Sequence, residues 1–341
     1  MLRSLPLALA TAALALPASA QIVDRSVGGR PGQIYATYSW GHVEKAYDGN
    51  AGMVNYGSRY ATRTPDGTNA TFTRAAFGAQ YDVLRVGEYA AYLGAEASMA
   101  QAVLEVADRP GVAGSGYEAT SDGFKLQNIA LSAGFRGPAY WVRAGYLLDR
   151  GGKVAVNGTG DIDLSNTDGA DAVVVGAGVR YPGEFGIGFD AGVDYYLTLN
   201  KTGIETTLPA TLGGTATYDL DPADYIDAYA GVSTRFSLVE LGAQLRYFGQ
   251  RAGEVTNFSN PLAAAAIEAE LASIPGRVPA EEDGFAVGVI PYVTLSPASF
   301  PVQLTVAGAA MREYLPYGFT LTGQHTPVGR TGVTATLKVG F

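Results

Sequence analysis

The chain has 341 residues, of which 47% are hydrophobic and 16% are charged, with 45 Gly, 21 Tyr and no Cys. This apolar content and a modest net charge of −9 exclude a disordered chain, and the absence of Cys excludes a disulfide scaffold and a thiolate zinc site. The same negative charge opposes binding to a phosphate backbone, so we expect no nucleic-acid partner.

The first predicted element is a secretory signal peptide at residues 1–20, MLRSLPLALATAALALPASA. Arg3 supplies the positive start, an apolar stretch follows it, and Ala18–Ala20 forms a small-residue cleavage site. The stretch is too short for a transmembrane anchor and has no stop-transfer flank. The mature chain is therefore expected to start at Gln21 and to leave the cytoplasm, with residues 21–32 as a periplasmic N-terminal arm.

The rest of the chain, residues 33–341, alternates apolar residues with polar or small ones. The last segment shows the pattern, with an apolar face made of Val333, Ala335, Leu337, Val339 and Phe341. A period of two is typical of a strand with one apolar and one polar face. About twelve such segments begin near residues 33, 72, 88, 124, 139, 171, 185, 224, 238, 284, 300 and 331. Each has roughly ten residues or more, the length that a tilted strand needs to cross a bilayer.

The connections between these segments alternate strictly in length. The short connections are 84–87, 136–138, 182–184, 237–238 and 296–299. The long connections are 43–71, 108–122, 150–170, 200–223, 250–283 and 313–330. A soluble sandwich has no reason to sort its loops in this way, whereas a membrane barrel has short periplasmic turns and long extracellular loops. The sequence predicts an all-β fold, an antiparallel up-and-down transmembrane β-barrel of about 12 strands, with 10 or 14 as alternatives.

The terminal strand VTATLKVGF ends on Phe341, with an apolar residue at every second position before it. On this strand and the alternation before it, the mature chain resembles the bacterial outer-membrane β-barrel proteins, and these residues single out no subfamily. The resemblance implies location in the outer membrane of a Gram-negative bacterium. It also implies contact with lipid and lipopolysaccharide, and an assembly machinery that recognises Phe341.

The alternation also predicts which charged residues face the lumen. The predicted pore-lining residues are Arg74, Asp82, Glu96, Arg143, Arg180, Asp190, Asp194, Asp227, Arg235, Glu240, Arg246 and Lys338. Many other inward positions are Gly, which favours an open, water-filled pore if small residues leave room. Twelve strands about 4.8 Å apart and tilted about 40° give a diameter of roughly 24 Å and a lumen of roughly 10 Å at most. In the competing interpretation, opposite charges pair across this narrow lumen and close it.

Three further features leave alternatives open. The long loops are acidic at Asp161, Asp163, Asp168 and Asp171, which fits a solvated surface or divalent-cation binding. Residues 260–276 have helical spacing and form either a lid on the mouth or a helix on its rim. Inward aromatic residues fit either wall packing or a stacking track for sugars, and they are Tyr92, Trp141, Tyr196, Tyr225, Tyr229 and Tyr292.

The predicted function is a porin-like channel for passive diffusion of small hydrophilic solutes, with no cofactor and no metal. The alternative is a closed barrel that acts as a structural or surface-interaction protein through its extracellular loops. An outer-membrane hydrolase is a more distant alternative, because the two histidines, His42 and His325, have no recognisable nucleophile motif around them. We therefore expect the chain not to be an enzyme.

Overall fold

The structure is a computed structural model. It describes residues 30–47, 53–55, 69–106, 117–120, 123–150, 153–156, 160–163, 171–181, 186–199, 201–207, 215–221, 224–250, 254–257, 259, 284–297, 300–315 and 326–341. The predicted signal peptide at 1–20, the helical segment at 260–276 and His325 lie outside the described residues. The predicted arm at 21–32 lies outside them except for its last three residues.

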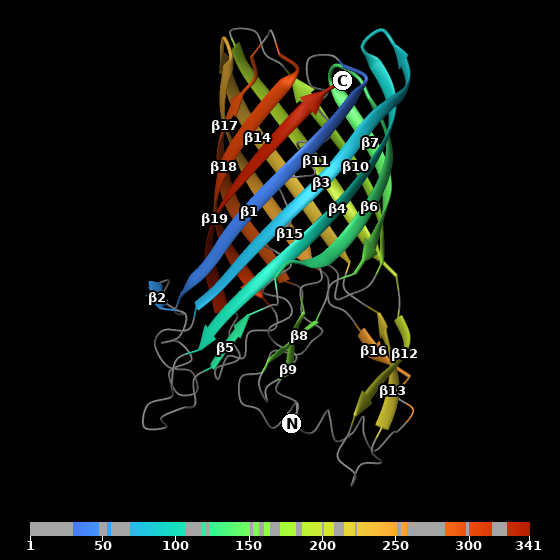
Figure 1. The fold of residues 1–341 in the computed structure, drawn as a ribbon, viewed down its shortest axis with the longest axis vertical. Helices are drawn as coiled ribbons and strands as arrows, with labels where there is room; N and C mark the ends of the chain where they lie inside the picture. The colour runs from blue at the N-terminus through green and yellow to red at the C-terminus, as the bar shows by residue number, and fades with distance from the viewer. Residues whose placement is uncertain are drawn as a thin grey trace.

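Twelve long strands form a closed antiparallel barrel, as the alternation of the sequence predicted (Figure 1). They are β1 (Gly32–Tyr47), β3 (Asn69–Val86), β4 (Tyr89–Val106), β6 (Lys125–Arg136), β7 (Tyr140–Asp149), β10 (Ala172–Tyr181), β11 (Ile187–Thr198), β14 (Tyr225–Phe236), β15 (Val239–Gln250), β17 (Gly284–Leu295), β18 (Val302–Leu315) and β19 (Thr326–Gly340). Each strand pairs with the next of these along the chain, which gives the up-and-down order. The predicted fold class and strand number are confirmed.

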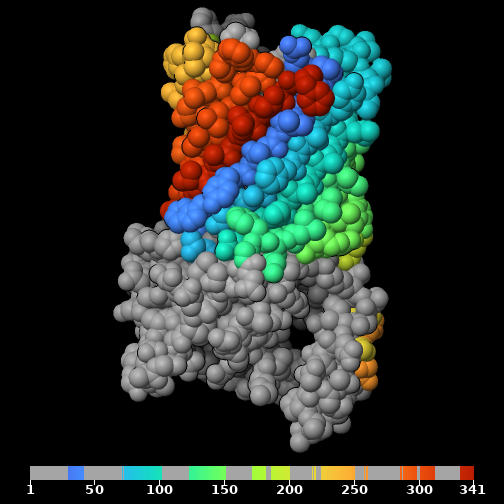
Figure 2. Space-filling model, viewed as in Figure 1, coloured from blue at the N-terminus to red at the C-terminus, as the bar shows by residue number. Residues whose placement is uncertain are grey.

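The barrel closes because the first strand pairs with the last. The register between β1 and β19 runs from Gln33 opposite Gly340 to Ala46 opposite Val328, with one irregularity between Val43 and Lys45. Figure 2 shows the blue β1 lying diagonally between the red β19 and the cyan β3. No edge strand of the barrel is therefore left with unpaired backbone groups, which is the condition for a sheet to lie in lipid.

The two faces of the barrel are the reverse of those of a soluble protein. On β15, Leu241 and Leu245 are exposed, and Leu245 has 62% of its surface accessible. Their neighbours Gln244 and Arg246 are buried, and Arg246 is only 1% accessible. Large apolar side chains therefore cover the outside and polar side chains occupy the inside, because successive residues of a strand point to opposite faces. This surface matches lipid rather than water.

The remaining strands are short and lie beyond one end of the barrel (Figure 1). They are β2 (Met53–Asn55), β5 (Tyr117–Thr120), β8 (Lys153–Val156), β9 (Gly160–Asp163), β12 (Lys201–Thr207), β13 (Thr215–Asp221) and β16 (Glu254–Thr256). We call this end the loop end. The opposite end, which we call the turn end, carries the two-residue turn at Gly87–Glu88, the one at Ser237–Leu238, and the terminal Phe341. The described part of the chain contains no helix of the length and apolar character needed to cross a membrane.

Candidate functional site: the barrel interior

The predicted lining residues lie on the face opposite to the exposed apolar residues, with one at the margin. Those that are buried are Arg74, Asp82, Asp190, Asp194, Asp227, Arg246 and Lys338. Those that are half-buried are Glu96, Arg143, Arg180 and Glu240. Arg235 differs, because it is exposed next to the turn at Ser237 and its Nε donates to the Ser237 carbonyl. The structure thus gathers most of the predicted charges inside the barrel and leaves Arg235 at its rim.

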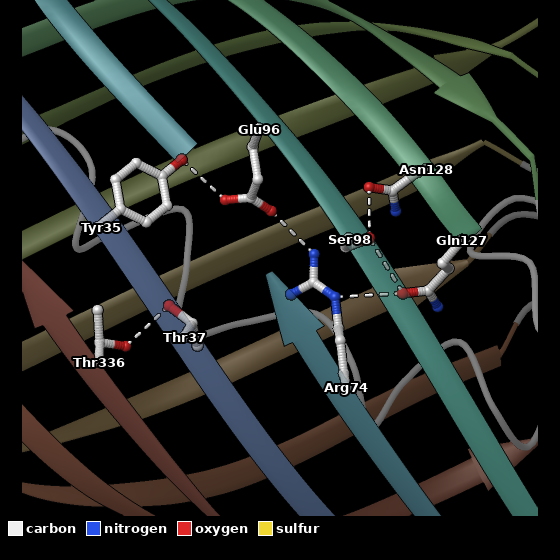
Figure 3. A network of polar contacts seen from close by, with 8 residues as sticks. All are labelled: Tyr35, Thr37, Arg74, Glu96, Ser98, Gln127, Asn128 and Thr336. Carbon is white, nitrogen blue, oxygen red and sulfur yellow. Dashed lines mark hydrogen bonds and ion pairs between the residues drawn. The ribbon is translucent and has the colours of Figure 1, made fainter. Parts of the chain in front are cut away.

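A polar network on β1, β3, β4 and β6 centres on Arg74 (Figure 3). The Arg74 Nη2 donates to Glu96 Oε1 at 2.9 Å, and the Tyr35 hydroxyl donates to the other carboxylate oxygen of Glu96 at 2.9 Å. The Glu96 carboxylate therefore links side chains of β1 and β3 to its own strand, β4.

A β-bulge adds a residue to this network that the sequence pattern did not reveal. The register of β4 against β6 shifts between Ser98, opposite Asn128, and Met99, opposite Leu126. The register of β4 against β6 skips Gln127, and the bulge allows its side chain to share the inner face with Asn128. Its Oε1 accepts from Arg74 Nε at 3.2 Å and from Ser98 Oγ at 3.3 Å. The sequence signal for this residue is that Gln127 and Asn128 are consecutive polar residues within a strand, which interrupts the alternation.

The inward glycines provide the space in which the interior side chains pair. Gly176 lies opposite Arg143 on one neighbouring strand and opposite Asp194 on the other. Arg143 donates to both carboxylate oxygens of Asp194, at 2.8 and 2.6 Å, and this pair lies over Gly176, where a Cβ atom would overlap Asp194 Oδ1. The same arrangement recurs in the rows Tyr35–Gly78–Glu96 and Asp190–Gly231–Gln244. The glycines therefore do not leave open room, contrary to our interpretation of the sequence, because neighbouring side chains fill it.

Inward aromatic rings occupy the space over other glycines in the same way. A Cβ atom at Gly178 would overlap the ring of Trp141, which lies directly opposite it. The guanidinium of Arg143 lies 5.2 Å from the centre of that ring, a cation–π distance. Further rings over opposite glycines are Tyr35 over Gly78, Tyr92 over Gly134, Tyr229 over Gly192 and Tyr292 over Gly242. Aromatic residues thus pack against the wall, and Trp141 is also covered by an arginine.

Four charged residues form one cluster on β7, β11, β14 and β15. Arg143 pairs with Asp194, and Arg246 pairs with Asp227 through both its Nε, at 2.7 Å, and its Nη2. The two pairs adjoin, because Asp194 and Asp227 lie directly opposite each other on β11 and β14. All four side chains are at most 11% accessible. The cluster is neutral as a whole, and each arginine uses two nitrogens, which fixes its position more tightly than a single contact.

The other predicted lining residues with described contacts lie nearer the turn end. Arg136 pairs with Asp82, and the Tyr292 hydroxyl donates to Glu240 Oε1 at 3.3 Å. Gln244 donates to Asp190 Oδ2 at 3.0 Å, whereas Asp190 Oδ1 is buried and accepts no hydrogen bond. Paired charges therefore line much of the interior, and one carboxylate oxygen each of Asp82 and Asp190 is buried without a hydrogen bond.

Two acidic residues at the loop end, Asp171 and Asp224, accept hydrogen bonds from the ends of neighbouring strands. Asp171 accepts from the Tyr146 hydroxyl at 3.1 Å and from the Asp149 amide at 3.0 Å. Asp224 accepts from the Tyr195 hydroxyl at 2.5 Å and from the Thr198 amide at 3.0 Å. In the described ranges, no three His, Cys, Asp or Glu residues come together in a way that could hold a metal ion. The side chain of His42 lies outside the described residues.

Comparison with known proteins supports the architecture. No family model matches the chain, and no curated protein matches it. An outer membrane channel from Pseudomonas putida F1 is similar in structure, with a TM-score of 0.55 and 8% sequence identity over 94% of this chain and 98% of that chain. The β domain of the Bordetella autotransporter BrkA is less similar, with a TM-score of 0.43 and 13% identity over 90% of this chain and 99% of that chain. The first likeness shows that the chain has the fold of an outer-membrane β-barrel.

Proposed function

We propose that this chain is an outer-membrane channel through which small hydrophilic solutes diffuse passively. The observation that carries the proposal is the closed barrel with an apolar outside and a polar, charged inside. A polar, charged inner face suits a water-filled passage, because the wall can contact hydrated solutes. The similar Pseudomonas putida F1 protein is described as an outer membrane channel, which supports the proposal.

The proposed location is the outer membrane, reached through a signal peptide at 1–20 that is cleaved after export. The turn end would face the periplasm and the loop end the outside, because short turns are periplasmic in barrels of this kind. Lipid and lipopolysaccharide would surround the barrel, and the assembly machinery would recognise Phe341. We propose no catalytic activity and no cofactor.

The mechanism we propose is size exclusion by a wall whose charges are arranged in pairs. The described ion pairs inside the barrel are Arg74–Glu96, Arg136–Asp82, Arg143–Asp194 and Arg246–Asp227. Each pair joins charges of opposite sign within hydrogen-bond distance, so their fields partly cancel at the lumen axis. We therefore expect only weak selectivity between cations and anions in the unmodified channel.

The test is the single-channel conductance of the refolded mature protein in a planar bilayer, with the reversal potential in a salt gradient. We expect stable conductance steps and a reversal potential near zero. Arg143→Gln should shift the reversal potential toward cation preference, because Asp194 is then uncompensated. Folded protein without conductance would overturn the proposal.

A closed barrel that acts through its loops is the second candidate. It is favoured by the low accessibility of the interior charges, since Arg246 and Lys338 are each only 1% accessible. This candidate predicts folded protein that is silent in both the unmodified and the Arg143→Gln form. The conductance measurement therefore separates the two functions.

A further inference from the structure

The interior contains an apolar cluster at its loop end, formed by Tyr225, Phe248 and Met311 with Tyr196 packed against it. The rings of Tyr225 and Phe248 have their centres 5.5 Å apart. Their sequence neighbours Ile226 and Tyr247 are exposed on the outside of the barrel, so the cluster lies on the inner face. Phe248 and Met311 thus bring side chains without a hydrogen-bonding group into a largely polar interior.

Charged residues lie next to the cluster on its turn-end side. On β11, β14 and β15, the next inward residue toward the turn end is charged in each case. Asp194 follows Tyr196, Asp227 follows Tyr225 and Arg246 follows Phe248, and all three charges are paired. On this side of the wall, an apolar layer formed by the cluster therefore lies nearer the loop end than a neutral layer of ion pairs.

Met311 reaches the cluster across a glycine. It lies opposite Gly288 on β17, where a Cβ atom would overlap the Met311 side chain. Arg246 lies opposite the same Gly288 on its other side. Met311 therefore bridges the apolar layer and the charged layer, and its flexible thioether chain can adapt to a bound group.

These contacts suggest what the cluster would bind. A hydrated ion loses water contacts in an apolar constriction and gains nothing in exchange. An aromatic ring can replace the contact between Tyr225 and Phe248 with an equivalent one. The ion pairs below carry no net charge, so they suit hydroxyl or carbonyl groups better than a charged group.

We infer that the Tyr225–Phe248–Met311 cluster is a specificity-determining subsite for small uncharged solutes that carry both an aromatic ring and hydroxyl groups. This inference rests on the proposed function, because it names the class of solute that the proposed channel favours. The subsite should retain a ring-bearing solute, whereas a solute of the same polarity without a ring should pass by size alone.

The test compares phenyl β-D-glucoside with methyl β-D-glucoside in vesicle-swelling measurements on the refolded full chain. With size exclusion alone, the larger phenyl glucoside should enter more slowly than the methyl glucoside. With the subsite, the phenyl glucoside should enter faster than the methyl glucoside. Phe248→Ala should lower the phenyl-to-methyl rate ratio by about two- to tenfold, the range for one aromatic pair. Leu245→Ala, on the same strand but facing outward, is the matched control and should leave the ratio unchanged.

The outcomes separate the two proposals. Swelling with methyl glucoside that is faster than with phenyl glucoside, with the same ratio in Phe248→Ala, overturns the subsite and leaves the channel intact. No swelling with either glucoside, from folded protein that is also silent in bilayers, overturns the channel itself. If Phe248→Ala does not fold, Phe248→Leu removes the ring while keeping most of the volume, and the same fall in the ratio is expected.

Discussion

Asp194 and Asp227 lie directly opposite each other on the neighbouring strands β11 and β14, and both are buried in the barrel interior. Like charges in a cross-strand pair repel each other. The arrangement is stable only because Arg143 approaches Asp194 from one side and Arg246 approaches Asp227 from the other. Both arginines are thus needed, because the loss of either one leaves its aspartate carboxylate uncompensated next to the other aspartate.

We therefore predict that Arg246→Ala lowers the free energy of unfolding by about 3–5 kcal/mol, the usual cost of leaving a buried charge without its partner. Urea unfolding of the protein in lipid vesicles would measure it. The double variant Arg246→Ala/Asp227→Ala should recover part of the loss, because it also removes the uncompensated carboxylate.

The control for this prediction is Arg150→Ala. Arg150 pairs with Asp171 at 3.3 Å, but its side chain is 49% accessible. An exposed pair of this kind contributes under about 1 kcal/mol. Equal losses for Arg150→Ala and Arg246→Ala would show that the interior cluster does not stabilise the barrel as proposed.

The second prediction concerns the glycine beneath the Arg143–Asp194 pair. Gly176→Ala should lower the temperature at which the folded barrel unfolds in detergent, since its methyl group would displace the Asp194 carboxylate. Heat-dependent mobility in electrophoresis measures this temperature. Gly308→Ala is the control, because an added Cβ there meets Pro291 at 3.8 Å, an ordinary contact. A Gly176→Ala barrel as heat-stable as Gly308→Ala would contradict the prediction.

The third prediction concerns the anchor at the loop end of β14. Asp224→Ala removes the acceptor for the Thr198 amide and the Tyr195 hydroxyl. We expect faster hydrogen exchange at the Thr198 amide, with little change in the barrel strands away from it, because the loss is local. Asp224→Asn keeps one carbonyl oxygen as acceptor and should show a smaller effect. Unchanged exchange at Thr198 in Asp224→Ala would mean that this contact does not hold the strand end.

The fourth prediction tests whether the apolar outside faces lipid. Leu245 lies within β15 and points outward, whereas Leu238 is exposed in a turn. Leu245→Arg should lower the stability of the barrel in vesicles by about 2–4 kcal/mol if it lies near the middle of the bilayer, and Leu238→Arg by about 0–1 kcal/mol. Urea titration in vesicles gives both values. A Leu238→Arg loss as large as that of Leu245→Arg would argue against lipid around this face.

The strand number and the two faces of the barrel followed from the sequence alone. The alternation in the last segment, ending on Phe341, recurs in β19, where Val333 and Leu337 are exposed while Thr336 and Lys338 are buried. This information is local, because a period of two within one strand is enough to assign its faces. The same period, followed along β7, β11 and β15, assigns Arg143, Asp194 and Arg246 to the inner face.

Only the tertiary structure decided which of these inward residues meet. The row Arg143–Gly176–Asp194 depends on the register of three strands, and no single strand carries that register in its own sequence. The bulge that turns Gln127 inward also breaks the simple alternation. The sequence therefore determined which residues face the interior and which face lipid, because the direction of a side chain is set within one strand. The pairing of its charges over glycines depended on strand-to-strand register, which arises only when the barrel closes.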